Sequence, residues 1–255
     1  MAIFKSGNPT LSEKIFNTTV ADQNQGVMTA RGAMNKFGFL FFMVIASAGF
    51  TWHLFDQGKV QLMMPLMLTG IIGGLIVAIV ITFKQSWAGY LAPLYGLLEG
   101  LFLGAISAML NAAFAEKYPG LIMNAIGLTL GVGVAMFLLF NFRIIRATER
   151  FKSVVFTATL GIAMFYLIMW VLRLFGVEME VMSINNGSLL GIGISLFVVV
   201  IAALNLIIDF DMIEKGAEMG APKYMEWYCA FALMVTIVWM YIEMLKLLSR
   251  LNSRN

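Results

Sequence analysis

The sequence predicts an all-α membrane protein, a bundle of seven transmembrane helices. Hydrophobic residues make up 60% of the 255 residues and charged residues only 12%, whereas soluble domains carry roughly 25% charged residues. The hydrophobic residues gather in seven long runs, and each run is close to the roughly 20 residues that a helix needs to cross a bilayer. A soluble chain of this composition would expose apolar patches and aggregate, so we expect the lipid bilayer to be its solvent.

The seven runs are apolar on every side and are separated by short connections. Transmembrane strands would instead show segments of about ten residues with alternating polarity. We therefore expect one helical domain over residues 37–248, with a polar leader, residues 1–36, before it and a short basic tail, residues 249–255, after it. The expected helices run Phe37–Phe55, Val60–Phe83, Trp87–Phe114, Leu121–Phe142, Val154–Phe175, Ser188–Ile208 and Trp227–Leu248.

Basic residues predict the orientation, because the cytoplasmic loops of membrane proteins carry an excess of Lys and Arg. The leader and the connections after the second and fourth runs lie on one side if every run spans the membrane. Their basic residues are Lys5, Lys14, Arg31, Lys36, Lys84, Arg143, Arg146, Arg150 and Lys152. The opposite loops are weakly charged or acidic, so we expect the N-terminus to lie in the cytoplasm.

The C-terminal segment conflicts with this orientation. Seven spans place the C-terminus outside, yet the segment carries Lys246, Arg250 and Arg254. Either these long side chains reach to the far membrane interface, or one run enters and leaves the membrane on the same side. We favour the first explanation.

The remaining composition excludes several function classes. The net charge is +3, but the basic residues lie between apolar runs, so we expect no nucleic-acid partner. The single cysteine, Cys229, excludes an internal disulfide, and no His/Cys cluster has zinc-site spacing, so we expect no cofactor and assign no metal ligand. We expect no enzyme, because the only histidine, His53, lies near a helix end and no nucleophile with a positioned base is visible.

Glu99 is the strongest functional signal inside the membrane. It lies about twelve residues into the third run, which is about 18 Å at 1.5 Å per residue and near the midplane. A charged group at the bilayer centre costs about 2.5–3.5 kcal/mol on insertion scales, so such a residue is a functional candidate. The alternative is a protonated or hydrogen-bonded glutamate that only joins helices.

A second group of acidic residues lies near the last two runs, on the expected cytoplasmic side. Asp209 and Asp211 end the sixth run, Asn205 shares a helix face with Asp209, and Glu226 opens the seventh run. The alternatives are a solvated helix end for the two aspartates and the preference of a helix N-terminus for an acidic residue at Glu226.

Buried carboxyl groups suggest a pH-gated cation pathway. A carboxyl group in a low-dielectric bundle holds its proton more tightly than in water, and a second carboxylate nearby strengthens this effect. Such groups can titrate near neutral pH and thereby change their attraction for cations. Glu243 and Lys246 are three residues apart, so we expect them to pair with each other.

Glycines recur at a spacing that favours close helix packing. Small residues at intervals of about four let helix backbones approach each other in lipid. The glycines concerned are Gly96, Gly100 and Gly104 in the third run, and Gly127, Gly131 and Gly133 in the fourth.

Two segments of the chain resemble a known family. The leader contains Asn8-Pro9-Thr10-Leu11-Ser12-Glu13-Lys14-Ile15-Phe16 and then Met28-Thr29 with Gly32 and Lys36. The C-terminal part contains residues 217–222, Met225-Glu226-Trp227-Tyr228, Ala230-Phe231 and Val235-Thr236-Ile237-Val238-Trp239. Over nearly its whole length the chain resembles the bacterial branch of the Bax inhibitor-1 (transmembrane Bax inhibitor motif) family, often labelled Bax inhibitor-1/YccA.

The resemblance implies a seven-helix fold with the last helix central, and a pH-sensitive calcium leak channel or carrier. It also implies that two aspartates on the last two helices share a hydrogen bond and act as sensor and gate. Asp209 matches the first of these aspartates, but Thr236 stands where the second is expected. The usual sensor is therefore altered, and our own hypothesis is that Glu99 supplies the missing acid.

Two functions are consistent with these residues and with the resemblance. The first is a leak channel or carrier whose partner is a cation, Ca2+ or H+. The second is a non-conducting interaction protein that restrains another membrane protein, such as a membrane protease, as some YccA-type members are thought to do. Flux through the purified protein distinguishes the two. The resemblance also implies a location in the bacterial inner membrane.

Overall fold

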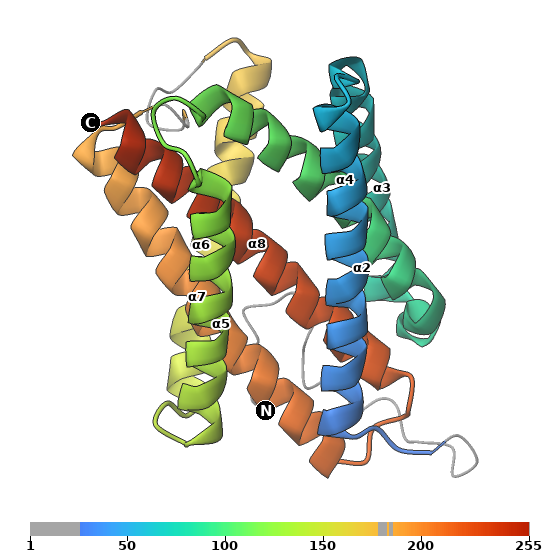
Figure 1. The fold of residues 1–255 in the computed structure, drawn as a ribbon. Coiled ribbons are helices and arrows are strands. Elements are labelled where there is room, and N and C mark those ends of the chain that lie inside the picture. The colour runs from blue at the N-terminus through green and yellow to red at the C-terminus, as the bar shows by residue number, and fades with distance from the viewer. Residues whose placement is uncertain (1–25, 178–182, 184–185, 255) are drawn as a thin grey trace. The chain divides into compact units, whose positions relative to one another are not determined.

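The computed structural model describes residues 26–177, 183 and 186–254, and it is helical over nearly all of them. Seven of the described helices are long and apolar enough to cross a membrane, which confirms the predicted fold class (Figure 1). The leader motif at residues 8–16 lies outside the described residues, and so do Glu178 and Glu180, two of the acidic residues in the loops expected opposite the cytoplasm.

Each predicted run corresponds to one long helix. Two short 3-10 turns, η1 (Val60–Leu62) and η2 (Gln85–Trp87), precede the second and third of these helices. The helices are α2 (Ala30–Asp56), α3 (Met63–Phe83), α4 (Ala88–Phe114), α5 (Leu121–Asn141), α6 (Glu149–Leu174), α7 (Leu189–Glu218) and α8 (Met225–Ser253).

Local capping chemistry explains why the helices extend beyond the apolar runs. Helix α2 begins seven residues before Phe37, where the Thr29 side chain accepts a hydrogen bond from the Gly32 N–H at 2.9 Å. Helix α6 begins in the same way, because Thr148 accepts from the Phe151 N–H at 3.3 Å. A capping side chain satisfies an N–H group that the helix itself leaves without an acceptor.

The prediction that Asp209 and Asp211 end their helix is wrong. Helix α7 continues to Glu218, because most of residues 212–218 are good helix formers such as Met, Glu, Lys and Ala. The chain turns at Gly220, whose φ of 67° suits glycine. Hydropathy marks where a chain leaves the apolar layer, and this helix extends well past that point.

The chain divides into two compact units, which we describe separately. One unit holds α2, α3, α4 and the segment Met212–Val235, which contains the end of α7 and the beginning of α8. The other holds α5, α6, the part of α7 up to Asp211 and the part of α8 from Thr236 onward.

In the unit that contains α2 and α4, glycines bring two helix backbones together. A Cβ atom at Gly100 would lie 2.5 Å from the Val44 carbonyl oxygen, and one at Gly104 would lie 2.5 Å from that of Ala48. This confirms the close packing predicted for these two glycines. The expectation is wrong for Gly127 and Gly131 of α5, because a Cβ there would meet no atom within 4 Å.

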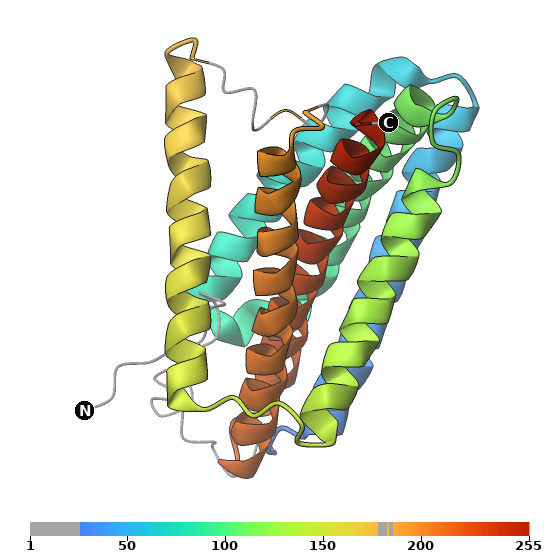
Figure 2. The ribbon, with the colours of Figure 1, turned by 90° about the vertical axis from the view of Figure 1, so that its left-hand side faces the viewer.

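In the other unit, α7 packs against α5, α6 and α8. The Phe137 and Phe140 rings of α5 lie 5.4 and 5.9 Å from the Phe210 ring, and Ile162 of α6 packs against Val198 and Ile201 of α7. Figure 2 shows α6, α7 and α8 running next to one another.

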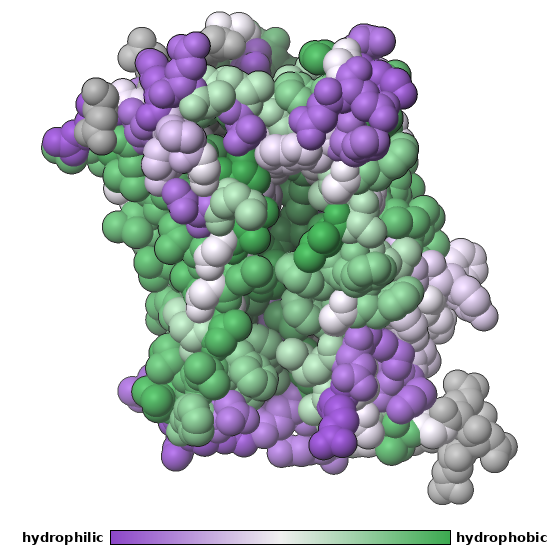
Figure 3. Space-filling view, in the orientation of Figure 1, coloured by the Kyte–Doolittle hydropathy of each residue, from purple (hydrophilic) through white to green (hydrophobic). Residues whose placement is uncertain are grey.

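Helix α8 contributes residues to both units. Its first part contacts α2 and α4 through the ring pairs Trp227–Phe39 and Phe231–Tyr95, and its later part contacts α5, α6 and α7. In its most apolar window 72% of the residues are buried, against 11% for α6. Figure 3 shows hydrophobic residues over the middle of the helices and hydrophilic residues near their ends, as a bilayer requires.

Candidate functional site

Asp209 and Thr236 are in direct contact. Asp209 on α7 is fully buried and Thr236 on α8 is 3% exposed, and the Thr236 hydroxyl donates a hydrogen bond of 2.6 Å to Asp209 Oδ2. A hydroxyl can also accept a hydrogen bond, so this contact can persist whether or not the carboxyl group carries a proton. The threonine therefore occupies the hydrogen-bonding position that the resemblance gives to a second aspartate.

Asp211 forms a buried ion pair two residues further along α7. Its Oδ2 lies 2.8 Å from Nζ of Lys152 on α6, and both residues are buried. The alternative account of Asp211 as a solvated helix end is therefore wrong, because the chain continues as a helix and α6 covers the carboxylate. A buried charge needs such a partner to offset its lost hydration.

Asn205 lies one helical turn from Asp209 and carries an unsatisfied oxygen. Its Nδ2 donates to Thr159 Oγ1 on α6 at 2.8 Å and to the Ile201 carbonyl at 2.9 Å. The residue is 1% exposed, and its Oδ1 has no hydrogen-bond partner among the residues that the structure describes. A buried acceptor left without a partner costs about 1–3 kcal/mol, so this oxygen is a candidate ligand for a small guest.

Glu243 lies seven residues after Thr236 on α8 and is 2% exposed. The Tyr166 hydroxyl of α6 lies 3.1 and 3.0 Å from its two oxygens, and Lys246 Nζ lies 2.9 Å from Oε1. The pairing of Glu243 with Lys246 is confirmed. Lys246 Nζ also lies 4.7 Å from the centre of the Tyr166 ring, which is within cation–π range.

Arg250 explains part of the charge conflict at the C-terminus. Its guanidinium is buried and donates to the Gly191 carbonyl at 2.6 Å, to Ser195 Oγ at 2.9 Å and to the Ser183 carbonyl at 3.2 Å. Arg250 and Lys246 are thus bound by groups of the protein itself. Basic residues held in this way carry less orientation information than those in free loops.

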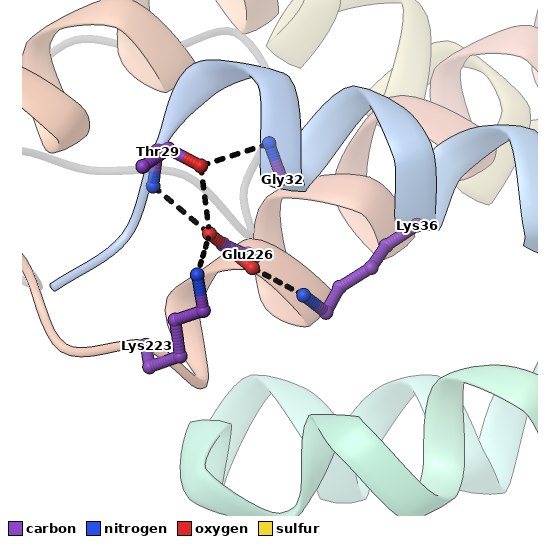
Figure 4. Close-up of polar contacts among 5 residues, drawn as sticks. All are labelled: Thr29, Gly32, Lys36, Lys223 and Glu226. Atoms are coloured by element: carbon purple, nitrogen blue, oxygen red, sulfur yellow. Dashed lines mark hydrogen bonds and ion pairs between the residues drawn. The ribbon is translucent and has the colours of Figure 1, made fainter. Parts of the chain in front are cut away.

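Glu226 lies at the centre of an ionic cluster at the start of α8 (Figure 4). Its Oε1 accepts from the Thr29 N–H at 2.9 Å, from Thr29 Oγ1 at 3.0 Å and from Lys223 Nζ at 2.8 Å. Its Oε2 pairs with Lys36 of α2. Glu226 therefore does more than favour a helix N-terminus, because it also fastens the beginning of α2 to α8.

Glu99 lies in the unit that contains α3 and α4. Its carboxyl group packs over Gly74 of α3, where a Cβ would lie 3.0 Å from Oε1. Asp209 and Thr236 belong to the other unit. The hypothesis that Glu99 supplies a second acid for Asp209 therefore stays a prediction.

A comparison with models of protein families identifies the family of this chain. The model of the Bax inhibitor 1 like family matches residues 8–253, nearly the whole chain. The chain belongs to this family. Comparisons with curated proteins and with solved structures gave no match. Together with seven apolar helices, membership makes this Bax inhibitor 1 like protein a multi-pass membrane protein.

For this Bax inhibitor 1 like protein, the sequence did not lead us to Thr159 and Tyr166, and it gave Lys152 and Arg250 only a role in orientation. Lys152, Thr159 and Tyr166 recur at intervals of seven on α6 and share one face, since seven residues make about two turns. Thr236, Glu243 and Arg250 recur in the same way on α8. This regular spacing of polar residues within apolar helices was the signal that could have found them.

Proposed function

We propose that this Bax inhibitor 1 like protein is a pH-sensitive cation leak channel or carrier that passes calcium, with Asp209 as its titrating group. The observation that supports this function is the fully buried Asp209 carboxyl group, hydrogen-bonded from α7 to Thr236 of α8. Acidic residues inside transmembrane helices typically mark ion pathways or proton relays. No covalent chemistry is part of the proposal.

The titration of one group gives the pathway its pH dependence. The ionised Asp209 carboxylate attracts a cation, and its protonation removes that charge, so calcium leak falls when the proton binds. Two aspartates would release their protons in two coupled steps. Since Thr236 carries no titrating proton in this range, the hydrogen-bonded pair here titrates as a single group.

The experiment is calcium flux into vesicles that contain the purified protein and a trapped calcium dye, measured at acid and neutral pH. The parent is expected to leak in a pH-dependent manner, and Asp209→Asn is expected to remove that dependence. Glu99→Gln tests the second acid in the same assay. If Asp209→Asn and Glu99→Gln both leak as the parent does at each pH, these residues are not the gate.

Flux also separates this function from the alternative. A folded protein that passes no calcium at any pH would favour the non-conducting function, in which the protein restrains a membrane protease or another membrane partner. In that case the buried acidic residues would serve helix packing alone.

We also propose that the N-terminus is cytoplasmic and that the membrane is the inner membrane of a bacterium. The exposed arginines of the α5–α6 connection support this orientation, and Lys246 and Arg250 are bound internally. Cysteines introduced at the exposed residues Lys59 and Arg146 test it with a membrane-impermeant maleimide. Labelling of Lys59→Cys alone on intact cells is expected, and labelling of Arg146→Cys alone would reverse the orientation.

A further inference from the structure

Three helices of one unit carry the same order of side chains along one face. Each helix has two polar residues with apolar residues between them, about one turn from each. The polar pairs are Thr159 and Tyr166 on α6, Ser195 and Asn205 on α7, and Thr236 and Glu243 on α8. Helix α7 runs antiparallel to α8, because Asp209 bonds Thr236 and Ser195 bonds Arg250. It also runs antiparallel to α6, because Asn205 bonds Thr159 and Asp211 pairs with Lys152. Helices α6 and α8 are therefore parallel to each other. The matching segments of the three helices therefore lie at the same depth.

The apolar residues at the middle depth form a compact cluster, which we call the apolar plug and define as Ile162, Val198 and Ile201. Their exposed fractions are 7%, 2% and 6%, and Trp239 of α8 packs against them. On α6 the plug lies between Thr159 and Tyr166. On α7 it lies between Asn205 and Ser195, and on α8 its neighbour Trp239 lies between Thr236 and Glu243.

Polar groups lie on both sides of the apolar plug. On one side are Asp209, Thr236 and the unsatisfied Oδ1 of Asn205. On the other side are Glu243 and Tyr166, which bond each other. Thr236 and Glu243 are seven residues apart, which is about 10.5 Å along α8.

Glu243 and Tyr166 already hold a cation, the ammonium group of Lys246. That group lies 2.9 Å from the Glu243 carboxylate and faces the Tyr166 ring. The Lys246 side chain is 26% exposed, so it can move away and leave a carboxylate and an aromatic face for another cation. Arg250 is the next positive group on α8, and its guanidinium is held by the beginning of α7.

We propose that Glu243 and Tyr166 form a second cation site, and that the apolar plug is the barrier between this site and Asp209. The inference rests on the proposed leak function and extends it, because it names the path that the cation takes and the place where that path is closed. A constriction lined by Ile and Val stops a hydrated ion because water leaves the apolar space. Opening requires the plug to separate or to become wet.

A matched pair of substitutions on α7 tests the barrier, with calcium alone as the probe in the dye-loaded vesicles. Val198→Ser places a hydroxyl in the plug, whereas Val200→Ser makes the same change at a side chain that is 47% exposed. We expect Val198→Ser to raise calcium leak severalfold at every pH and Val200→Ser to leave it at the parent level. Equal leak from both variants would overturn the barrier.

A double variant tests the second site. Glu243→Gln is expected to remove the gain of Val198→Ser, and a gain that persists in full would overturn the role of Glu243. Should Val198→Ser fail to give a single species in detergent, Ile201→Thr tests the same barrier. A parent and a folded Val198→Ser that both pass no calcium contradict the proposed function itself. A parent that leaks while the plug variants change nothing contradicts only this inference.

Discussion

Glu226 on α8 and Asp209 on α7 are both fully buried carboxyl groups, yet they differ in the kind of group that binds them. Two lysines and both donors of Thr29 surround Glu226 (Figure 4). The hydrogen bond that links Asp209 to α8 comes from a neutral hydroxyl. Opposite charges hold Glu226 in its ionised form, whereas a hydroxyl partner tolerates either form. We infer that the Glu226 cluster fixes the structure and that Asp209 is the group that can change.

The Lys152–Asp211 ion pair allows a test of this comparison, because it is a second charged contact with a structural role and lies only two residues from Asp209. Lys152→Met removes the ammonium group that lies 2.8 Å from the buried Asp211 carboxylate, and we expect a loss of about 3–5 kcal/mol in the free energy of unfolding. Thermal and denaturant unfolding in detergent measure this loss. The double variant Lys152→Met with Asp211→Asn is expected to recover most of it. Without recovery, the cause would be a change in packing and not the loss of this ion pair.

Glu226→Ala tests the other side of the comparison. The substitution removes the acceptor that joins Thr29, Lys36 and Lys223, and we expect a loss of about 1–3 kcal/mol. This loss is smaller than that for Lys152→Met because Lys36 and Lys223 are 20% and 51% exposed and can be hydrated. Glu218→Ala, at an exposed position of α7, is the matched control. Equal unfolding midpoints for the two variants would show that the cluster contributes nothing.

Hydrophobicity predicted the fold well, because every helix that crosses the bilayer needs a run of about 20 apolar residues. All seven runs became helices, and the glycine spacing at Gly100 and Gly104 predicted a true backbone contact. The helix ends were predicted less well, as the extension of α7 past Asp211 shows. Ends depend on capping residues such as Thr29 and Gly220, which hydropathy does not record.

The candidate site was predicted only in part, because depth in a helix does not reveal its partners. The resemblance puts Thr236 where the family has the partner of Asp209, and in the structure the two side chains are hydrogen-bonded. Glu243 was assigned only to Lys246, since a single helix shows neighbours three or four residues away. The roles of Tyr166 and Asn205 depend on contacts between helices. A sequence indicates such contacts only where polar residues recur at intervals of seven within apolar helices.

Thr236→Val separates hydrogen bonding from shape at Asp209. Valine has nearly the volume of threonine but cannot donate, so the ionised Asp209 loses one hydrogen bond, and we expect a loss of about 1–2 kcal/mol near neutral pH. Thr236→Ser keeps the hydroxyl and is expected to lose less. Unfolding in detergent at acid and neutral pH compares them. A difference between Val and Ser that is the same at both pH values would mean that the bond does not respond to the charge of Asp209.

Asp209→Asn is expected to have the smallest effect on stability and a full effect on the pH response. The amide oxygen still accepts from the Thr236 hydroxyl, so we expect a change in the free energy of unfolding below about 1 kcal/mol. The amide cannot titrate, so calcium leak becomes independent of pH. Glu226→Gln is the reciprocal variant, because it weakens the ionic cluster but keeps Asp209, and its leak should retain the pH dependence of the parent. If Glu226→Gln abolished that dependence and Asp209→Asn retained it, the two carboxyl groups would have to exchange the roles assigned to them here.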